Sequence, residues 1–376
     1  MSTTFIVGFV LACFVPPLIL SAVATGLMRR WAAKLGLVDQ PGDRKVHTEP
    51  TPLGGGIGIW LGVIAPLAVA QLGVVLLAGS EERQAMLPAE IGVDWQEVLA
   101  RSGQLWAVLL GGTLLAAMGL LDDLKSLSWK LRLLVQFCLA VAVVAGGTTA
   151  TVFVELPYVG MALTVLWILV LVNAFNFLDN MDGLSSGVAL IAAVMFAAVL
   201  LTSTGQPRWL VGGVLLVLAG SVAGFLVFHN WPPAKIFMGD AGSCFLGWML
   251  ACLTVMGTFY EENFASRHVI LAPLCVLAVP LYDFCSVVII RLREGRSPFQ
   301  PDKKHFSHRL VELGLRPRNA VLTIHLATLT TGIGALLLYR VKSWTGAGLI
   351  VTLVGCVLAI MAILETAGRN GKALKE

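Results

Sequence analysis

The chain has 376 residues and a formal net charge of +4; 57% of its residues are hydrophobic and 13% are charged. Soluble domains carry about 25% charged residues. This composition, with a mean hydropathy of +0.85, therefore excludes a disordered chain, a fibrous protein and an ordinary soluble enzyme. No basic stretch is interleaved with aromatic residues, which argues against nucleic acid as a partner.

Eleven apolar stretches follow one another along the chain, and each approaches the roughly 20 residues that a helix needs to cross a bilayer. They cover residues 5–28, 53–78, 105–121, 131–145, 158–175, 184–201, 209–228, 243–258, 269–290, 321–339 and 344–364. The predicted fold class is all-α: a polytopic integral membrane protein with about eleven transmembrane helices, forming a single membrane domain over residues 1–376.

The basic residues are distributed unequally between the two sets of loops that eleven spans create. One set contains 20 of the 26 lysines and arginines, whereas the other contains six and is rich in Asp and Glu. Because cytoplasmic loops carry an excess of Lys and Arg, we predict that the N-terminus lies outside and the C-terminus in the cytoplasm. The four polar clusters described next all fall on the cytoplasmic side, where we expect the active site.

The first polar cluster is Asp122-Asp123, at the end of the third predicted span. Two adjacent carboxylates oppose the helix dipole, and a solvated helix end would favour Lys or Arg. Such a pair can hold Mg²⁺, or one member can act as a base or nucleophile; the alternative is a polar end to a membrane span. Shortly afterwards, Lys130 and Arg132 either hold phosphate oxygens or serve as positive anchors.

The second cluster places Asn173, Asn176, Asp179 and Asp182 at intervals of three residues. On a helix, this spacing gathers the four side chains along one slowly rotating stripe. Polar groups at the edge of a bilayer are costly unless they bind a partner. Their oxygens suit Mg²⁺ or Mn²⁺, or the hydroxyls of a nucleotide or sugar; a polar loop is the alternative.

The third cluster surrounds Asp240, in the sequence from Lys235 to Ser243 that leads into the eighth predicted span. An Asp at this place can be a helix N-cap alone. The other interpretation is a metal ligand beside a helix N-terminus, where backbone N–H groups and the helix dipole favour phosphate.

The fourth cluster lies in the long cytoplasmic loop 291–319, where a helix is predicted to begin at Asp302. One face of this amphipathic helix carries His305, His308 and Arg309. We predict that the helix lies over the active site and donates to phosphate oxygens. A basic helix lying on lipid headgroups is the alternative.

Three further features have two interpretations each. The glycines of 54–58 follow no strand, so they favour close helix packing over a dinucleotide-binding motif. The side chains of Arg44, Lys45 and His47 either meet phosphate or anchor their loop. Asp283 lies inside the ninth predicted span, where an acid is either functional or buried in a pairing role.

Together and in this order, the clusters resemble the polyprenyl-phosphate N-acetylhexosamine-1-phosphate transferase family. The resemblance is carried by 36–39 with Arg44, Lys45 and His47, by Asp122-Asp123, by 176–184 and 237–243, and by 297–299 with 302–310. The last motif is similar to the GlcNAc-1-phosphate branch, whose common form is His-x-His-His. Ser307 and Arg309 flank His308 here, so one histidine of that pattern is missing.

The resemblance implies a Mg²⁺-dependent enzyme, with Mn²⁺ as an alternative, in the bacterial cytoplasmic (inner) membrane. It would transfer GlcNAc-1-phosphate, or a related N-acetylhexosamine-1-phosphate, from a UDP-sugar to undecaprenyl phosphate and release UMP. This would be the first membrane step of a cell-envelope glycan such as lipopolysaccharide or teichoic acid. Membrane lipid is a further partner, and a homo-oligomer is an open alternative to a monomer.

The resemblance also implies roles for individual residues. Asn176 and Asp240 would bind Mg²⁺. Asp122, with Asp123 beside it, would deprotonate the lipid phosphate.

The remaining motif residues would contact the donor. Asp179 and Asp182 would meet the nucleotide or the metal, and the diphosphate and sugar would be held by His305, His308 and Arg309. A secondary transporter or lipid flippase is the alternative from another class. Such a protein often shows repeated topology, and no internal repeat is visible in this sequence.

Overall fold

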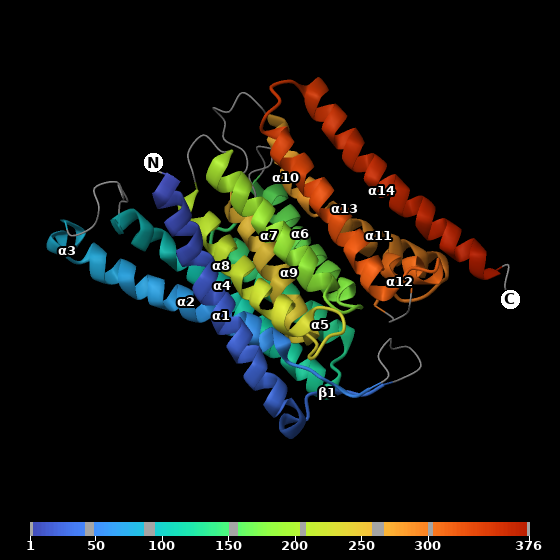
Figure 1. The fold of residues 1–376 in the computed structure, drawn as a ribbon. Helices are drawn as coiled ribbons and strands as arrows, with labels where there is room; N and C mark the ends of the chain where they lie inside the picture. Colours follow the sequence, from blue (N-terminus) through green and yellow to red (C-terminus); the bar gives the residue numbers. More distant parts are fainter. Residues whose placement is uncertain are drawn as a thin grey trace.

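The computed structural model describes residues 3–41, 49–85, 95–149, 157–203, 208–257, 267–299 and 304–373, which form an α-helical bundle (Figure 1). Within these ranges the strands are β1 (Val38–Asp39) and β2 (Thr51–Pro52), which pair antiparallel. The all-α prediction is confirmed.

The helices coincide with the apolar stretches of the sequence. The long ones are α1 (Thr3–Trp31), α2 (Gly55–Ala78), α4 (Trp95–Lys125), α5 (Trp129–Ala145), α6 (Pro157–Leu178), α7 (Leu184–Thr202), α8 (Trp209–Phe225), α9 (Gly239–Met256), α11 (Ala278–Arg293), α13 (Pro317–Leu338) and α14 (Trp344–Ala373). The shorter elements are η1 (Ala32–Leu35), α3 (Glu81–Ala85), the π-helical turn η3 (Leu226–Asn230), η4 (Arg267–Leu271), α10 (Ala272–Val276) and α12 (Phe306–Glu312).

The centre of the bundle is formed by α8 and α9, which are buried along nearly their whole length. Helix α8 packs against α1, α2 and α7, and α9 packs against α2, α4 and α6. Figure 1 shows α1 and α2 on one side of this centre and α13 and α14 on the other. These outer helices expose large apolar side chains, such as Val23 and Ile363, as expected where a surface faces lipid.

Nine of the described helices are long and apolar enough to cross a membrane, and a bent pair provides a tenth crossing if it is one span. The pair joins Arg267–Val276 to α11 at an angle of 66°, so the ninth predicted span is bent. The fourth predicted span, α5, has 17 residues. At 1.5 Å per residue it measures about 26 Å, shorter than the ~30 Å hydrocarbon core. The described chain is a multi-pass membrane protein. It reaches the eleven predicted crossings only if the bent pair is one span and α5 also crosses.

Glycines bring α2 and α9 into close backbone contact. A side chain at Gly56 would overlap the backbone of Gly242. The N–H groups of Gly55 and Gly56 donate to the carbonyls of Phe237 and Met238, at 2.9 Å each. The glycines of 54–58 therefore serve close helix packing, as predicted.

Gly119 is the point where α4 touches the start of α9, because a Cβ there would overlap the backbone of Asp240 and Ala241. We expect Gly119→Ala to push the two helices apart and to lower the Tm, since overpacking a tight interior costs about 1–3 kcal/mol. Gly103→Ala is the matched control in the same helix, because the space around Gly103 is open. Thermal unfolding in detergent compares the two variants, and equal Tm values would contradict the close contact.

Candidate active site

The first three polar clusters of the sequence meet at one end of the bundle. The end of α4 carries Asp122 and Asp123, and the start of α9 carries Asp240. Asp179 follows the end of α6 and interacts electrostatically with Asp123 and Asp240. We call Asp122, Asp123, Asp179 and Asp240 the acidic cluster.

Asp240 links the acidic cluster to two neighbouring helices. Its Oδ1 accepts a hydrogen bond from Asn176 Nδ2 at 2.9 Å, and its Oδ2 lies 2.7 Å from Arg132 Nη1. The residue lies in the first turn of α9, whose N-cap is Met238. Asp240 is therefore not the N-cap, and its carboxylate contacts α5 and α6 instead.

Arg132 joins two members of the acidic cluster. Its Nη1 atom lies 2.5 Å from Asp122 Oδ2 as well as 2.7 Å from Asp240 Oδ2. Asp122 also accepts a hydrogen bond from the backbone N–H of Leu127. Arg132 is thus more than a positive anchor at a helix end, because it balances two carboxylates that lie on different helices.

Asp123 points at the N-terminus of α9. Its Oδ1 accepts the N–H of Asp240 at 3.0 Å, and its Oδ2 accepts the N–H of Ala241 at 3.5 Å. Gly239 has a φ of 75°, and a side chain at that position would overlap the Asp123 carboxylate. The carboxylate of Asp123 therefore occupies the position at the N-terminus of α9 where an anion is favoured.

Asp179 shows how much negative charge the acidic cluster holds. The pKa of its carboxyl is raised well above the ordinary value, first by desolvation and then by the negative charges of Asp240, Asp123 and Asp182. Like charges in a desolvated site disfavour ionisation. A bound cation would relieve this repulsion.

The other two residues of the second sequence cluster have separate partners. Asp182 Oδ2 accepts the N–H of Ala234 at 2.9 Å, which fastens the loop before α9. Asn173 Nδ2 donates to Gln136 Oε1 at 2.7 Å. The predicted single stripe of four side chains is wrong, because α6 ends before Asp179 and the chain turns there.

The oxygen donors beside Asp240 fit a magnesium ion. Within the described ranges, no three His, Cys, Asp or Glu side chains are grouped as a metal site. Mg²⁺, however, is usually held by one or two protein carboxylates together with water and substrate phosphates. Asn176 Nδ2 is engaged by Asp240 and by Ser243 Oγ at 3.1 Å, which leaves its Oδ1 as an acceptor next to the Asp240 carboxylate. Asp240 and Asn176 are thus the residues that could hold such an ion.

The fourth sequence cluster forms α12, which begins at Phe306. Asp302 lies outside the described residues, and the backbone at 304 and 305 is not helical. Asp283 of α11 acts at the start of this helix instead. Its Oδ1 accepts the N–H of Phe306 at 2.9 Å, and its Oδ2 lies 2.8 Å from His305 Nδ1. The buried pairing role for Asp283 is therefore the one that the structure shows.

The basic side chains of α12 are largely covered by protein. His305 is 5% and Arg309 is 8% exposed, and Arg309 Nη1 pairs with Glu312 at 2.6 Å. The rings of His305 and His308 lie 6.3 Å apart. The charge of Arg309 is thus matched within its own helix, and its predicted contact with the donor phosphates stays a prediction.

Ser307 connects α12 to the loop that carries Asp179. Its Oγ donates to Asn180 Oδ1 at 2.6 Å, and Ser307 is almost fully buried. The neighbouring Phe177 ring lies edge-on to the His305 ring, with centroids 6.2 Å apart. Ser307, where this chain departs from the histidine pattern, therefore forms a packed contact between the second and fourth sequence clusters.

An aromatic group borders the same end of the bundle. Trp129 stacks on Phe299 with ring centroids 4.8 Å apart, and Phe177 meets Phe299 edge-on. The guanidinium of Arg291 lies 5.0 Å from the Phe177 ring centroid. Lys130 lies over the Trp129 ring and so borders this group; among the described residues, the acidic cluster pairs with Arg132 instead.

Three predicted phosphate-binding residues, Arg44, Lys45 and His47, lie outside the described residues. Strand β1 leads toward them and ends at Asp39, which interacts electrostatically with Asp123.

Sequence reasoning gave no role to two residues that hold the site together, Ser243 of the third cluster and Asn230. Ser243 accepts a hydrogen bond from Asn176, and Asn230 Oδ1 accepts from the N–H of Gly183 and from Ser186 Oγ. Each is a polar residue at the end of an apolar run. For Asn230, that placement was the signal in the sequence; Ser243 also closes the motif of residues 237–243.

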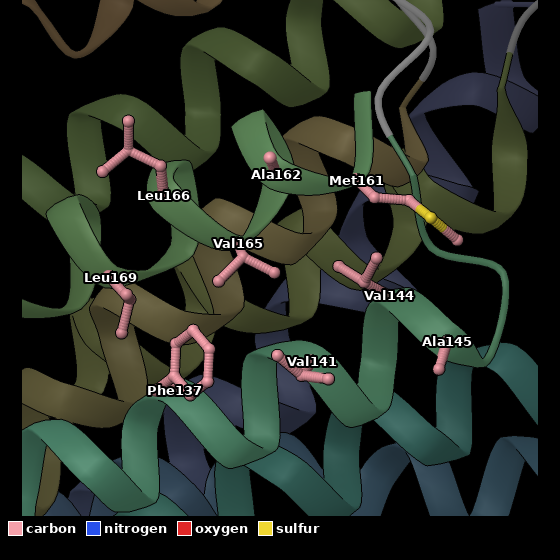
Figure 2. Close-up of a pocket in the computed structure, with 9 residues that line it drawn as sticks. All are labelled: Phe137, Val141, Val144, Ala145, Met161, Ala162, Val165, Leu166 and Leu169. Atoms are coloured by element: carbon pink, nitrogen blue, oxygen red, sulfur yellow. The ribbon is translucent and has the colours of Figure 1, made fainter. Parts of the chain in front are cut away.

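An apolar groove of about 510 Å³ runs between α5 and α6 (Figure 2). Its lining comes from Phe137, Val141, Val144 and Ala145 of α5 and from Met161, Ala162, Val165, Leu166 and Leu169 of α6. The same two helices carry Arg132 and Asn176, which contact Asp240. The helices that line the groove therefore also reach the acidic cluster.

Comparison with known proteins identifies the family. The model of "Glycosyl transferase family 4" matches residues 105–258, a segment that contains the whole acidic cluster.

Three named relatives match most of the chain. A probable undecaprenyl-phosphate N-acetylglucosaminyl 1-phosphate transferase of Bacillus subtilis is 32% identical over 97% of this chain and 94% of its own length. A decaprenyl-phosphate N-acetylglucosaminephosphotransferase of Mycobacterium tuberculosis is 35% identical, over 82% and 77%. The undecaprenyl-phosphate alpha-N-acetylglucosaminyl 1-phosphate transferase of Escherichia coli is 29% identical, over 84% and 81%. The chain therefore belongs to the polyprenyl-phosphate N-acetylhexosamine-1-phosphate transferase family and is a membrane phosphoglycosyltransferase.

Proposed function

We propose that the enzyme transfers GlcNAc-1-phosphate from UDP-GlcNAc to undecaprenyl phosphate. An oxygen of the lipid phosphate attacks the β-phosphorus of the donor, the bond from that phosphorus to the bridging oxygen breaks, and UMP leaves. The observation that carries the proposal is the acidic cluster with Arg132, which is assembled by α4, α5, α9 and the turn after α6. Phosphoryl transfer needs this combination of a metal-binding site, a cationic group and a positioned attacking oxygen.

The proposed metal is Mg²⁺, with Mn²⁺ as an alternative, held by Asp240 and Asn176. When bound, it would neutralise negative charge on the donor diphosphate and on the transferred phosphoryl group. Arg132 lies against Asp240 and Asp122 and is placed to hold a phosphate oxygen of the acceptor. Asp122 would take the proton of the lipid phosphate.

The apolar groove between α5 and α6 supports the lipid acceptor. Helix α5 is continuous from Arg132 to Phe137, and the offset of five positions corresponds to about 7.5 Å along its axis. Leu169 and Asn176 are about 10 Å apart along α6 by the same rise. A polyprenyl chain that lies in the groove would therefore bring its phosphate to the acidic cluster. The downstream product would feed a cell-envelope glycan pathway.

The orientation of the chain in the cytoplasmic membrane is part of the proposal. The distribution of basic residues places the C-terminus in the cytoplasm and the N-terminus outside. A reporter that is active only in the cytoplasm should work when fused after Glu376 and be silent when inserted at Glu81. An active reporter at Glu81 with a silent one at Glu376 would reverse the topology and move the acidic cluster to the wrong side for a nucleotide donor.

The direct test is an assay of the purified enzyme with UDP-GlcNAc and undecaprenyl phosphate. We expect UMP and a lipid-linked diphosphate sugar in the presence of Mg²⁺, and neither product when the metal is chelated. A secondary transporter or flippase would instead move a substrate across a vesicle without releasing UMP. Transport without UMP release would overturn the proposed function.

A further inference from the structure

Asn180 ties the turn after α6 to two other parts of the bundle. It directly follows Asp179 in the turn that joins α6 to α7. Its Nδ2 donates to the carbonyl of Phe177, in the last turn of α6, at 2.9 Å, and its Oδ1 accepts from Ser307 Oγ of α12 at 2.6 Å. Both ends of the amide are therefore engaged, one by the helix that leads into the turn and the other by α12.

Ser307 is a fixed point for this contact. It is 1% exposed, and its neighbours Phe306 and Leu310 are part of the hydrophobic core. The N–H of Phe306, at the start of α12, donates to Asp283 of α11, and α12 packs against α13 and α14. A hydroxyl on a segment that is packed on several sides can hold a turn in place.

The second half of the same turn is fastened to other elements. Asp182 Oδ2 accepts a backbone N–H from the loop before α9, and the N–H of Gly183 donates to Asn230 Oδ1 at 3.0 Å. These contacts lie after Asn180 in the chain. Asn180 therefore fastens the first half of the turn, which carries Asp179.

Asp179 needs such a fastening because the charges around it repel it. The carboxylates of Asp240, Asp123 and Asp182 all act on its carboxyl group. Like charges repel one another more strongly in a desolvated site than in water, so an unfastened turn would relax by moving Asp179 away from its neighbours. A neutral amide with two hydrogen bonds opposes this movement and adds no further charge.

We propose that Asn180, anchored by Ser307, is a positioning residue that holds Asp179 within the acidic cluster and so raises the affinity of the cluster for a divalent cation. This inference rests on the proposed function for the presence of the metal. With the carboxylates already gathered, the cation binds without a rearrangement of the turn. The apparent affinity falls in proportion to the fraction of molecules that have this arrangement.

The experiment measures binding of Mn²⁺ alone to the purified enzyme in detergent, by electron paramagnetic resonance of the free ion. We expect Ser307→Ala to weaken Mn²⁺ binding by about fivefold, the equivalent of one ordinary hydrogen bond. Asn180→Ala loses both hydrogen bonds and should weaken binding further. The double variant should bind Mn²⁺ no more weakly than Asn180→Ala, because the contact with Ser307 is already absent there.

Ser221→Ala is the matched control. Ser221 is buried, and its Oγ donates to the carbonyl of Ile59 at 2.7 Å, between α8 and α2. This variant also loses a buried hydrogen bond, so its Tm should fall as that of Ser307→Ala does, but its Mn²⁺ affinity should not change. A lowered Tm in Ser307→Ala with the Mn²⁺ affinity of the wild type would show that the contact only supports the fold, and would overturn the inference.

A second comparison tests whether Asn180 and Ser307 act through Asp179. Asp179→Asn should itself weaken Mn²⁺ binding, because it removes a negative charge from the cluster. In this background Ser307→Ala should have no further effect, since the carboxylate that it positions is gone. An undiminished effect of Ser307→Ala in the Asp179→Asn background would contradict the assignment.

Binding of Mn²⁺ without substrate keeps the test distinct from the proposed reaction. If the wild-type enzyme binds Mn²⁺ but makes no lipid-linked product, the proposed transfer fails, and the affinities of the variants still decide the inference. If the wild-type enzyme binds no Mn²⁺, the proposed metal site fails and the inference is overturned with it.

Discussion

Asp240→Asn is expected to lower kcat by about two to three orders of magnitude, the range seen when one group that stabilises the transition-state charge is removed. An amide oxygen binds a hard cation more weakly than a carboxylate, so raised Mg²⁺ should restore part of the activity. The carboxylate also contacts Asn176 and Arg132, and the Tm must therefore be compared first. Kinetics over a series of Mg²⁺ concentrations give both the loss of kcat and the part of it that Mg²⁺ restores.

Glu294→Gln provides the control for this experiment. Glu294 is exposed, pairs with Lys304 and lies outside the acidic cluster, so its loss should leave the Mg²⁺ dependence unchanged. Full activity in Asp240→Asn would remove Asp240 from the proposed metal site.

Asp122→Asn should also lose most of its activity, but raised Mg²⁺ should not restore it. Asn can still accept the N–H of Leu127, whereas the ion pair with Arg132 and the ability to take a proton are lost. A phosphate monoester has a second pKa of about 6. Below that pH the acceptor carries the proton that Asp122 would remove, and above it the proton is already gone. The deficit of the variant should therefore be largest near pH 6 and shrink as the pH rises.

Measurements of kcat for the wild type and Asp122→Asn from pH 6 to pH 9 would test this role. A deficit that does not change with pH would make Asp122 an orienting group. Equal rescue of Asp122→Asn and Asp240→Asn by Mg²⁺ would show that both residues bind the metal.

The sequence predicted the elements of the site better than their contacts. The apolar stretches located the helices, and the unusual polar residues at their ends located the acidic cluster. Contacts across the bundle are not encoded in local spacing. Asp123 and Asp240 lie on helices that are distant in the chain, and they meet because Gly119 and Gly239 leave no side chain between α4 and α9.

Local patterns failed where tertiary contacts decided the outcome. The three-residue spacing of Asn173 predicted a shared stripe, but Gln136 of α5 holds its amide. Asp302 looked like a suitable cap for a helix in the long loop, yet Asp283 from α11 receives the first N–H of α12. In both cases, the hydrogen bond comes from a partner far away in the sequence, which local spacing does not encode.

The central claim is that a sugar and its phosphate move together onto the lipid. The most direct measurement uses UDP-GlcNAc labelled with ³²P in the β-phosphate and with ³H in the sugar, together with undecaprenyl phosphate and Mg²⁺. Both labels should enter the lipid fraction in equal amounts, and unlabelled UMP should appear at the same rate. Transfer of ³H alone, with ³²P left in UDP, would identify a simple glycosyl transfer and would contradict the proposed reaction.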